Sequence, residues 1–218
     1  MSFGVAEERR DFLPAAGHDF FLPLYDPVSS LLGGDRAQRA LVNQANICPG
    51  QRILDIGCGT GTLAVLLKRL YSDVQVVGLD PDPKALKRAK TKAGRAGVSV
   101  QLDQGFADKL PYEQGAFNRV FSSFMFHHLE EQYREQTLSE VFRVLKAGGS
   151  FHLLDFAGDH GSHGLLGRLI HSGDRLKDNS TERILELMKR AGFKQAKKTG
   201  DGRMLFGLLR TAYYEASV

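Results

Sequence analysis

The chain has 218 residues, 42% of them hydrophobic, and a formal net charge of +4. This length suits one α/β domain with a short addition, and this hydrophobic content excludes a disordered chain. Two cysteines give no disulfide framework, and no apolar run reaches the ~20 residues that a membrane helix needs. The charged start lacks the apolar core of a signal peptide, so we expect a cytoplasmic protein.

The first part of the chain is predicted to form a helical cap over residues 1–46, ahead of a main domain over residues 47–218. Asp26-Pro27 is a typical helix start and Gly33-Gly34 a typical end, and a second helix is predicted over residues 35–45. Aromatic and imidazole side chains gather early in the cap: His18, Phe20, Phe21 and Tyr25. They are explained equally well by packing on a sheet and by lining a substrate cavity.

Beyond residue 50, short apolar runs alternate with amphipathic helical segments. Strands are predicted at residues 52–56, 74–79, 98–102, 117–122 and 151–156, and helices from the glycine-rich turn through residue 70, at 83–96 and at 131–145. Gly148-Gly149 is predicted to end the last of these helices. This alternation indicates a doubly wound α/β fold, with a parallel sheet covered by helices on both faces.

The C-terminal part has a different pattern. Asn179 is predicted to cap a helix whose apolar stripe is Ile184, Leu187, Met188 and Ala191, and Gly192 is predicted to end it. Residues 193–198 and 203–212 then flank a hairpin turn predicted at 199–202. The sheet is therefore expected to finish with one antiparallel strand.

A glycine-rich turn at residues 57–61 follows the first predicted strand, and Asp80 ends the second. Glycine lets a ligand approach the backbone closely, and an acid after the second strand can accept hydrogen bonds from ribose hydroxyls. In open α/β sheets such ligands bind beyond the carboxyl ends of the strands. A plain tight turn is the alternative for the glycines alone, and the combination with Asp80 favours a nucleoside-containing cofactor.

The residues around this turn favour S-adenosylmethionine (SAM) over a dinucleotide. A dinucleotide fingerprint needs a third glycine one position later, where Thr62 stands. Asp55, two residues before the first glycine, would repel a pyrophosphate but attract a cationic group. SAM carries an ammonium and a sulfonium and no phosphate.

The segment ILDIGCGTG at residues 53–61 resembles the first motif of class I SAM-dependent methyltransferases. Three later segments keep the family's order: GFADKLPY at 105–112, FNRVFSS with HHL at 117–129, and EVFRVLKAGG at 140–149. The resemblance covers about residues 49–156 and is strongest to the small-molecule branch near the quinone-biosynthesis C-methyltransferases. It implies a Rossmann-like sheet of seven strands, SAM as cofactor and S-adenosylhomocysteine as product.

The resemblance also implies roles for matching residues. Asp55 with Gly57, Cys58, Gly59 and Gly61 would hold the methionine end of SAM, and Ser123 would lie near it. On the nucleoside side, Asp80 would bind the ribose and Pro81 would lie against the adenine, which Phe106 and Ala107 would flank. The family often has Asp where Phe106 stands, so no side-chain hydrogen bond to the adenine amino group is expected.

Methyl transfer needs mainly alignment, and a general base matters only if the acceptor has a proton to lose. The catalytic residue is therefore left unknown. His127 and His128 could face the acceptor, although one packed and one solvated histidine is the favoured interpretation. Asp155 could equally be a base or a loop cap. Residues 157–178 are expected to form a variable substrate lid, and their His160 and His163 are not expected to bind a metal.

Six basic residues share the helix predicted at 83–96, namely Lys84, Lys87, Arg88, Lys90, Lys92 and Arg95. No aromatic residues interleave them, so a solvated face is favoured over a nucleic-acid patch. The prediction is a SAM-dependent methyltransferase acting on a small molecule, of unknown oligomeric state. The alternatives are an RNA methyltransferase and a non-catalytic SAM-binding partner protein.

Overall fold

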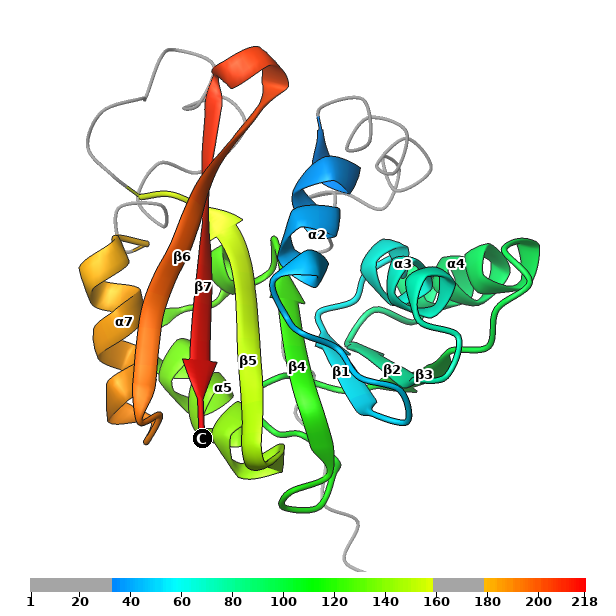
Figure 1. The fold of residues 1–218 in the computed structure, drawn as a ribbon, viewed down its shortest axis with the longest axis horizontal. Coiled ribbons are helices and arrows are strands. Elements are labelled where there is room, and N and C mark those ends of the chain that lie inside the picture. Colours follow the sequence, from blue (N-terminus) through cyan, green and yellow to red (C-terminus); the bar gives the residue numbers. More distant parts are fainter. Residues whose placement is uncertain (1–32, 159–178) are drawn as a thin grey trace, which may run out of the picture.

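The computed structural model describes residues 33–158 and 179–218, which form one seven-stranded sheet with helices on both faces (Figure 1). The strand order is β3-β2-β1-β4-β5-β7-β6. The strands are β1 (Arg52–Ile56), β2 (Gln75–Asp80), β3 (Gln101–Gln104), β4 (Phe117–Ser123), β5 (Leu145–Phe156), β6 (Gln195–Met204) and β7 (Leu209–Ser217). β1 to β5 pair in parallel, and β7 runs antiparallel to both β5 and β6. The predicted fold class, with its single reversed strand, is confirmed.

Alternate side chains of the central strands pack into two separate cores, one on each face of the sheet. One side of the sheet, with Ile53 of β1, packs against helices α2 (Gly34–Asn43) and α3 (Thr62–Leu70). The other side, with Leu54 of β1, packs against α5 (Glu131–Val144) and α7 (Thr181–Arg190). The helix α4 (Pro83–Arg95) lies beside α3 over β2 and β3. Neighbouring residues of one strand thus point to opposite layers, as the two-residue repeat of a strand requires.

The change from α5 to β5 differs from the prediction. The helix ends at Val144 and the strand begins at once at Leu145, so Gly148-Gly149 lies inside β5 instead of ending the helix. The register with β4 shifts between the Phe117 and Arg119 pairs, and the two glycines fall in that irregular stretch. A Cβ on Gly149 would stand 2.8 Å from the carbonyl oxygen of Lys146, which leaves no room for a side chain. The glycines therefore serve a β-bulge.

The C-terminal hairpin exists, but its turn was predicted in the wrong place. β6 runs through residues 199–202, and the chain turns at the 3₁₀ segment Leu205–Gly207. Gly200 lies at a register shift, and a Cβ on Gly202 would overlap the side chain of Thr211 on β7. These glycines allow close approach of two strands, which the sequence pattern cannot distinguish from a turn.

Two smaller boundaries also differ. The cap of α7 is Ser180, whose hydroxyl accepts the Arg183 backbone N–H at 3.3 Å, while the predicted cap Asn179 donates to the Phe156 carbonyl at 2.6 Å. β3 begins at Gln101, three residues later than predicted. The predicted stripe of α7 is buried as expected through Ile184, Leu187 and Met188. Within the described ranges, no helix is long and apolar enough to cross a membrane.

Candidate functional site

The glycine turn lies at the point where the strand order reverses, between β1 and β4. Gly57, Gly59 and Gly61 all take positive φ values, of 66°, 52° and 78°. A Cβ on Gly57 would overlap the Met125 side chain, and one on Gly61 would stand 2.8 Å from the Cβ of Ala89. The turn is therefore shaped both by backbone conformation and by close packing against two other elements.

Below the turn, Cys58 joins β1 to β2. Its backbone N–H donates to the Leu79 carbonyl at 3.0 Å, and its buried thiol lies where Gly78 leaves space on β2. Burial and the nearby carboxylates of Asp55 and Asp80 raise the pKa of the thiol well above its ordinary value. Cys58 is thus a neutral packing residue under the glycine turn, not a nucleophile.

Two buried carboxylates flank the turn. Asp80 accepts the backbone N–H of Gly59 at 2.8 Å and that of Asp82 at 2.9 Å, one on each carboxylate oxygen. Asp55 is 1% exposed, and among the described residues its Oδ2 has no hydrogen-bond partner. Burial, and for Asp55 also the neighbouring charge of Asp80, raises the pKa of both groups. The site therefore concentrates negative charge that would be stabilised by a cation.

One lysine of the basic helix departs from its predicted solvated role. The ammonium of Lys92 on α4 donates to the hydroxyls of Thr60 at 3.1 Å and Thr62 at 2.6 Å. It therefore ties α4 to the end of the glycine turn. The contact spans 30 or more positions along the chain, which is why the sequence pattern of the helix did not reveal it.

The segments after β2 and β3 are joined at the same edge of the sheet. The Gly105 backbone N–H donates to the Asp80 carbonyl at 3.2 Å, and the Gln104 side chain donates to the Pro81 carbonyl at 3.1 Å. The next residues, Phe106 and Ala107, are half-buried. The structure thus brings all of the predicted nucleoside-side positions into one region.

Ser123, at the end of β4, receives a contact that the sequence reasoning missed. The side-chain amide of Gln38 on α2 donates to the Ser123 hydroxyl at 3.1 Å. The Gln38 Oε1 is buried and lacks a hydrogen-bond partner within residues 33–158 and 179–218. α2 therefore adds a polar group to the site, and no local motif signals it because the partners are 85 positions apart.

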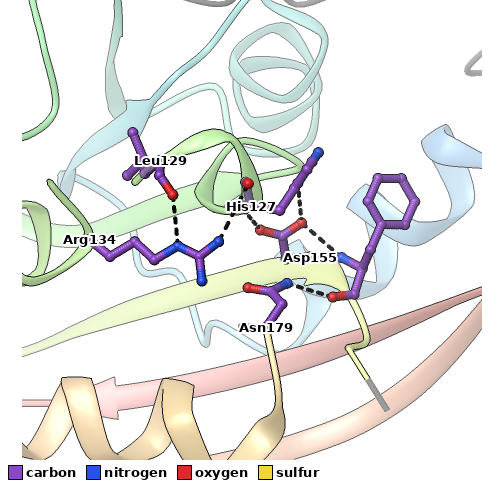
Figure 2. A network of polar contacts seen from close by, with 6 residues as sticks. His127, Leu129, Arg134, Asp155 and Asn179 are labelled. Carbon is purple, nitrogen blue, oxygen red and sulfur yellow. Dashed lines mark hydrogen bonds and ion pairs between the residues drawn. The ribbon is translucent and has the colours of Figure 1, made fainter. Parts of the chain in front are cut away.

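A histidine–aspartate pair joins the segment after β4 to the end of β5 (Figure 2). His127, in the 3₁₀ segment Phe126–His128 after β4, places its Nδ1 2.6 Å from Oδ1 of Asp155 on β5. Asp155 also accepts the backbone N–H groups of His127 and Phe156, each at 2.8 Å. His127 is buried and His128 is half-buried.

Burial alone would raise the pKa of Asp155, but His127 and the two backbone N–H groups together lower it below the ordinary value. Asp155 is therefore an ionised carboxylate that both caps the local backbone and contacts an imidazole. The sequence left a base and a loop cap as alternatives for Asp155, and the two backbone N–H groups that it accepts are capping contacts. The contact between Asp155 and His127 could have been expected from the adjacency of β4 and β5. The ends of neighbouring parallel strands meet at one edge of the sheet, which brings the residues after them together.

Several predicted residues lie outside the described ranges. These are the aromatic cluster of His18, Phe20, Phe21 and Tyr25, and the histidines His160, His163 and His171 of the predicted lid. Their predicted roles stay predictions, as does most of the division into a cap at 1–46 and a lid at 157–178.

Comparison with known proteins agrees with this arrangement. A methyltransferase-domain family model matches residues 53–149. The chain is 36% identical to a demethylmenaquinone methyltransferase of Deinococcus radiodurans, over 62% of this chain and 56% of that protein. It is 29% identical to a ubiquinone/menaquinone biosynthesis C-methyltransferase of Desulfotalea psychrophila, over 78% and 76%. The chain thus spans little more than half of the first relative.

Solved structures share the fold at low sequence identity. A Haemonchus contortus phosphoethanolamine N-methyltransferase solved with SAM has a TM-score of 0.74 at 18% identity, over 93% of this chain and 58% of that one. A [4+2]-cyclase, SpnF, has a TM-score of 0.71 at 18% identity, over 95% and 98%. Such likenesses describe architecture and not chemistry. The domain match and the sequence relatives support the predicted resemblance to class I SAM-dependent methyltransferases, in the branch of the quinone-biosynthesis enzymes.

Proposed function

We propose that this chain transfers a methyl group from SAM to a small-molecule acceptor. The observation that carries the proposal is the pair of buried carboxylates, Asp55 and Asp80, on either side of the glycine turn at the switch point of the sheet. The names of the sequence relatives, demethylmenaquinone and ubiquinone/menaquinone methyltransferases, support a small aromatic acceptor.

The chemistry of the residues present fits SAM. Among the described residues the buried Oδ2 of Asp55 has no hydrogen-bond partner, and burial raises the pKa of this group. An ammonium group bound beside it would stabilise its ionised form. Each oxygen of Asp80 uses one lone pair on a backbone N–H, so each keeps another for a ribose hydroxyl. The same two carboxylates would repel the pyrophosphate of a dinucleotide.

The remaining roles follow from position. Gly57, Cys58, Gly59 and Gly61 would present backbone to the methionine end of the cofactor, with Ser123 beside it and held by Gln38. In the segments joined to Asp80, Pro81, Phe106 and Ala107 would enclose the adenine. When bound, SAM supplies an electrophilic methyl group on a sulfonium. The protein's own contribution is to hold the acceptor in line, which can supply on the order of 7–11 kcal/mol.

Calorimetric titration of the full chain with SAM and with S-adenosylhomocysteine tests the proposal. Asp80→Ala should weaken SAM binding by roughly 1.5–3 kcal/mol, or about 10- to 150-fold, because a charged acceptor is lost. The matched control is Asp73→Asn, an exposed carboxylate before β2, which should leave the affinity unchanged. A folded wild-type protein that binds neither ligand would refute the proposal.

A further inference from the structure

The His127–Asp155 pair has the arrangement of a proton acceptor with its orienting group, and neither residue is among those proposed to hold the cofactor. We propose that His127 is the general base that takes a proton from the methyl acceptor, and that Asp155 is its positioning residue. The inference rests on the proposed function and narrows its substrate class to acceptors with a weakly acidic proton, such as phenols and hydroquinones.

The hydrogen bonds around Asp155 fix which imidazole nitrogen can act. The carboxylate accepts three hydrogen bonds, from the ring of His127 and from the backbone N–H groups of His127 and Phe156, so it cannot turn away from the ring. An ionised carboxylate only accepts, and the Nδ1 facing it at 2.6 Å must therefore carry the proton. In the neutral ring the lone pair is then on Nε2, at the edge turned away from Asp155 (Figure 2).

One acid and two basic groups lie around the imidazole. Asp155, which is fully buried, contacts its Nδ1. His128 lies with its ring centroid 4.0 Å from that of His127, and Arg134 on α5 donates to the His127 carbonyl at 3.4 Å and to the Leu129 carbonyl at 3.0 Å. These contacts hold the segment that carries the imidazole in place, as a positioned proton acceptor requires.

The position of the pair places it beside the glycine turn. Met125, two residues before His127, packs directly against Gly57. Phe124, directly after β4, has a φ of 56°, a strained conformation for a bulky residue and one that is concentrated at functional sites. The rings of Phe124 and His127 each lie 5.1 Å from that of Phe156. This aromatic surrounding suits an aromatic acceptor next to the base.

The proposed step balances as follows. The acceptor's O–H proton passes to Nε2 of His127, giving an imidazolium that Asp155 stabilises. The electron pair left on that oxygen, or on a ring carbon conjugated with it, forms the new bond to the methyl carbon. A ring carbon that is methylated in this way then loses its own proton to water, and the ring becomes aromatic again. The carbon–sulfur bond breaks with both electrons passing to sulfur, which leaves as a neutral thioether. No oxidant or reductant is consumed.

Two measurements on the full chain test the assignment. The first is the ¹⁵N spectrum of histidine-labelled protein at pH 8, with the His127 signals assigned from their loss in His127→Gln. The second is the rate of S-adenosylhomocysteine formation from SAM and a short-chain demethylmenaquinol, between pH 6 and 9. The matched control is His152→Gln, which removes a different buried histidine. His152 lies on β5 and its ring is hydrogen-bonded to the Ser150 hydroxyl.

We expect His127 to show a single neutral tautomer with its proton on Nδ1. We also expect His127→Gln to lower kcat by at least 100-fold and to remove its pH dependence, with the SAM affinity unchanged. Asp155→Asn should lower kcat at least tenfold, and His152→Gln should keep it within twofold. A proton on Nε2 would overturn the proposal, and so would a His127→Gln variant with a normal kcat.

The experiments distinguish a failure of the proposed function from a failure of the His127 assignment. If the wild type binds no SAM, the proposed function fails. If it binds SAM but does not methylate the quinol, that acceptor is excluded, and the tautomer measurement alone decides whether His127 is able to accept a proton.

Discussion

Gly61 allows a quantitative test of the packing between the glycine turn and α4. Its φ of 78° is left-handed, and an added Cβ would stand 2.8 Å from the Cβ and 3.2 Å from the Cα of Ala89. The left-handed conformation costs a non-glycine residue roughly 1–2 kcal/mol. Overpacking of a close contact adds about 1–3 kcal/mol, because Ala89 can yield only if the α4 backbone moves. Gly61→Ala should therefore lower the free energy of unfolding by about 2–5 kcal/mol.

Gly50 supplies the matched control. Its φ of 76° is nearly the same, but a Cβ there would have no neighbour within 4 Å. Gly50→Ala should show only the conformational cost, and both variants share the same small entropic gain from the unfolded chain. Urea unfolding of the two variants, compared with the wild type, thus isolates the contact with Ala89. Equal losses of stability in the two variants would show that the turn and α4 are not closely packed, and the reasoning would be refuted.

Two further predictions concern stability at other positions. Gly94 is exposed in α4 with an ordinary φ and open space around it, so Gly94→Ala should raise the free energy of unfolding by about 0.5–1 kcal/mol in the same urea assay, and a loss would contradict it. Asp55 has a pKa raised by burial and by Asp80, so its contribution to stability is present below the ordinary pKa of an aspartate and declines as the pH rises through the folded-state pKa. Asp55→Asn should therefore raise the thermal midpoint at pH 7 and flatten its dependence on pH while weakening SAM binding; an unchanged midpoint together with unchanged affinity would exclude both roles of this carboxylate.

Local patterns determined much of this protein. The limits of β1 were predicted to the residue, and those of β2, β4, α3 and α4 nearly so, because apolar periodicity and capping are properties of adjacent residues. The glycine turn and Asp80 were placed for the same reason, since the turn directly follows β1 and Asp80 ends β2. The ordered motifs then led to the family, which the domain match and the sequence relatives bear out.

The local pattern gave wrong predictions where a glycine is required by close contact with a distant segment. Gly148-Gly149 was interpreted as a helix end and Gly200 as part of a turn, although both lie at register shifts inside strands. A glycine required by a neighbouring strand has the same local sequence signature as one required by a turn. Only the partner strand distinguishes the two.

The polar contacts of the site were likewise decided by the tertiary structure. The Gln38–Ser123 and His127–Asp155 pairs join residues 85 and 28 positions apart, and Lys92 reaches Thr62 across 30. Each residue taken alone fits a surface, a cap or a core position equally well. The sequence by itself determined the sheet, the turn and the acids beside it, because those depend on neighbouring residues. The pairing of side chains across the carboxyl edge depends on strand order, which appears only once the sheet has assembled.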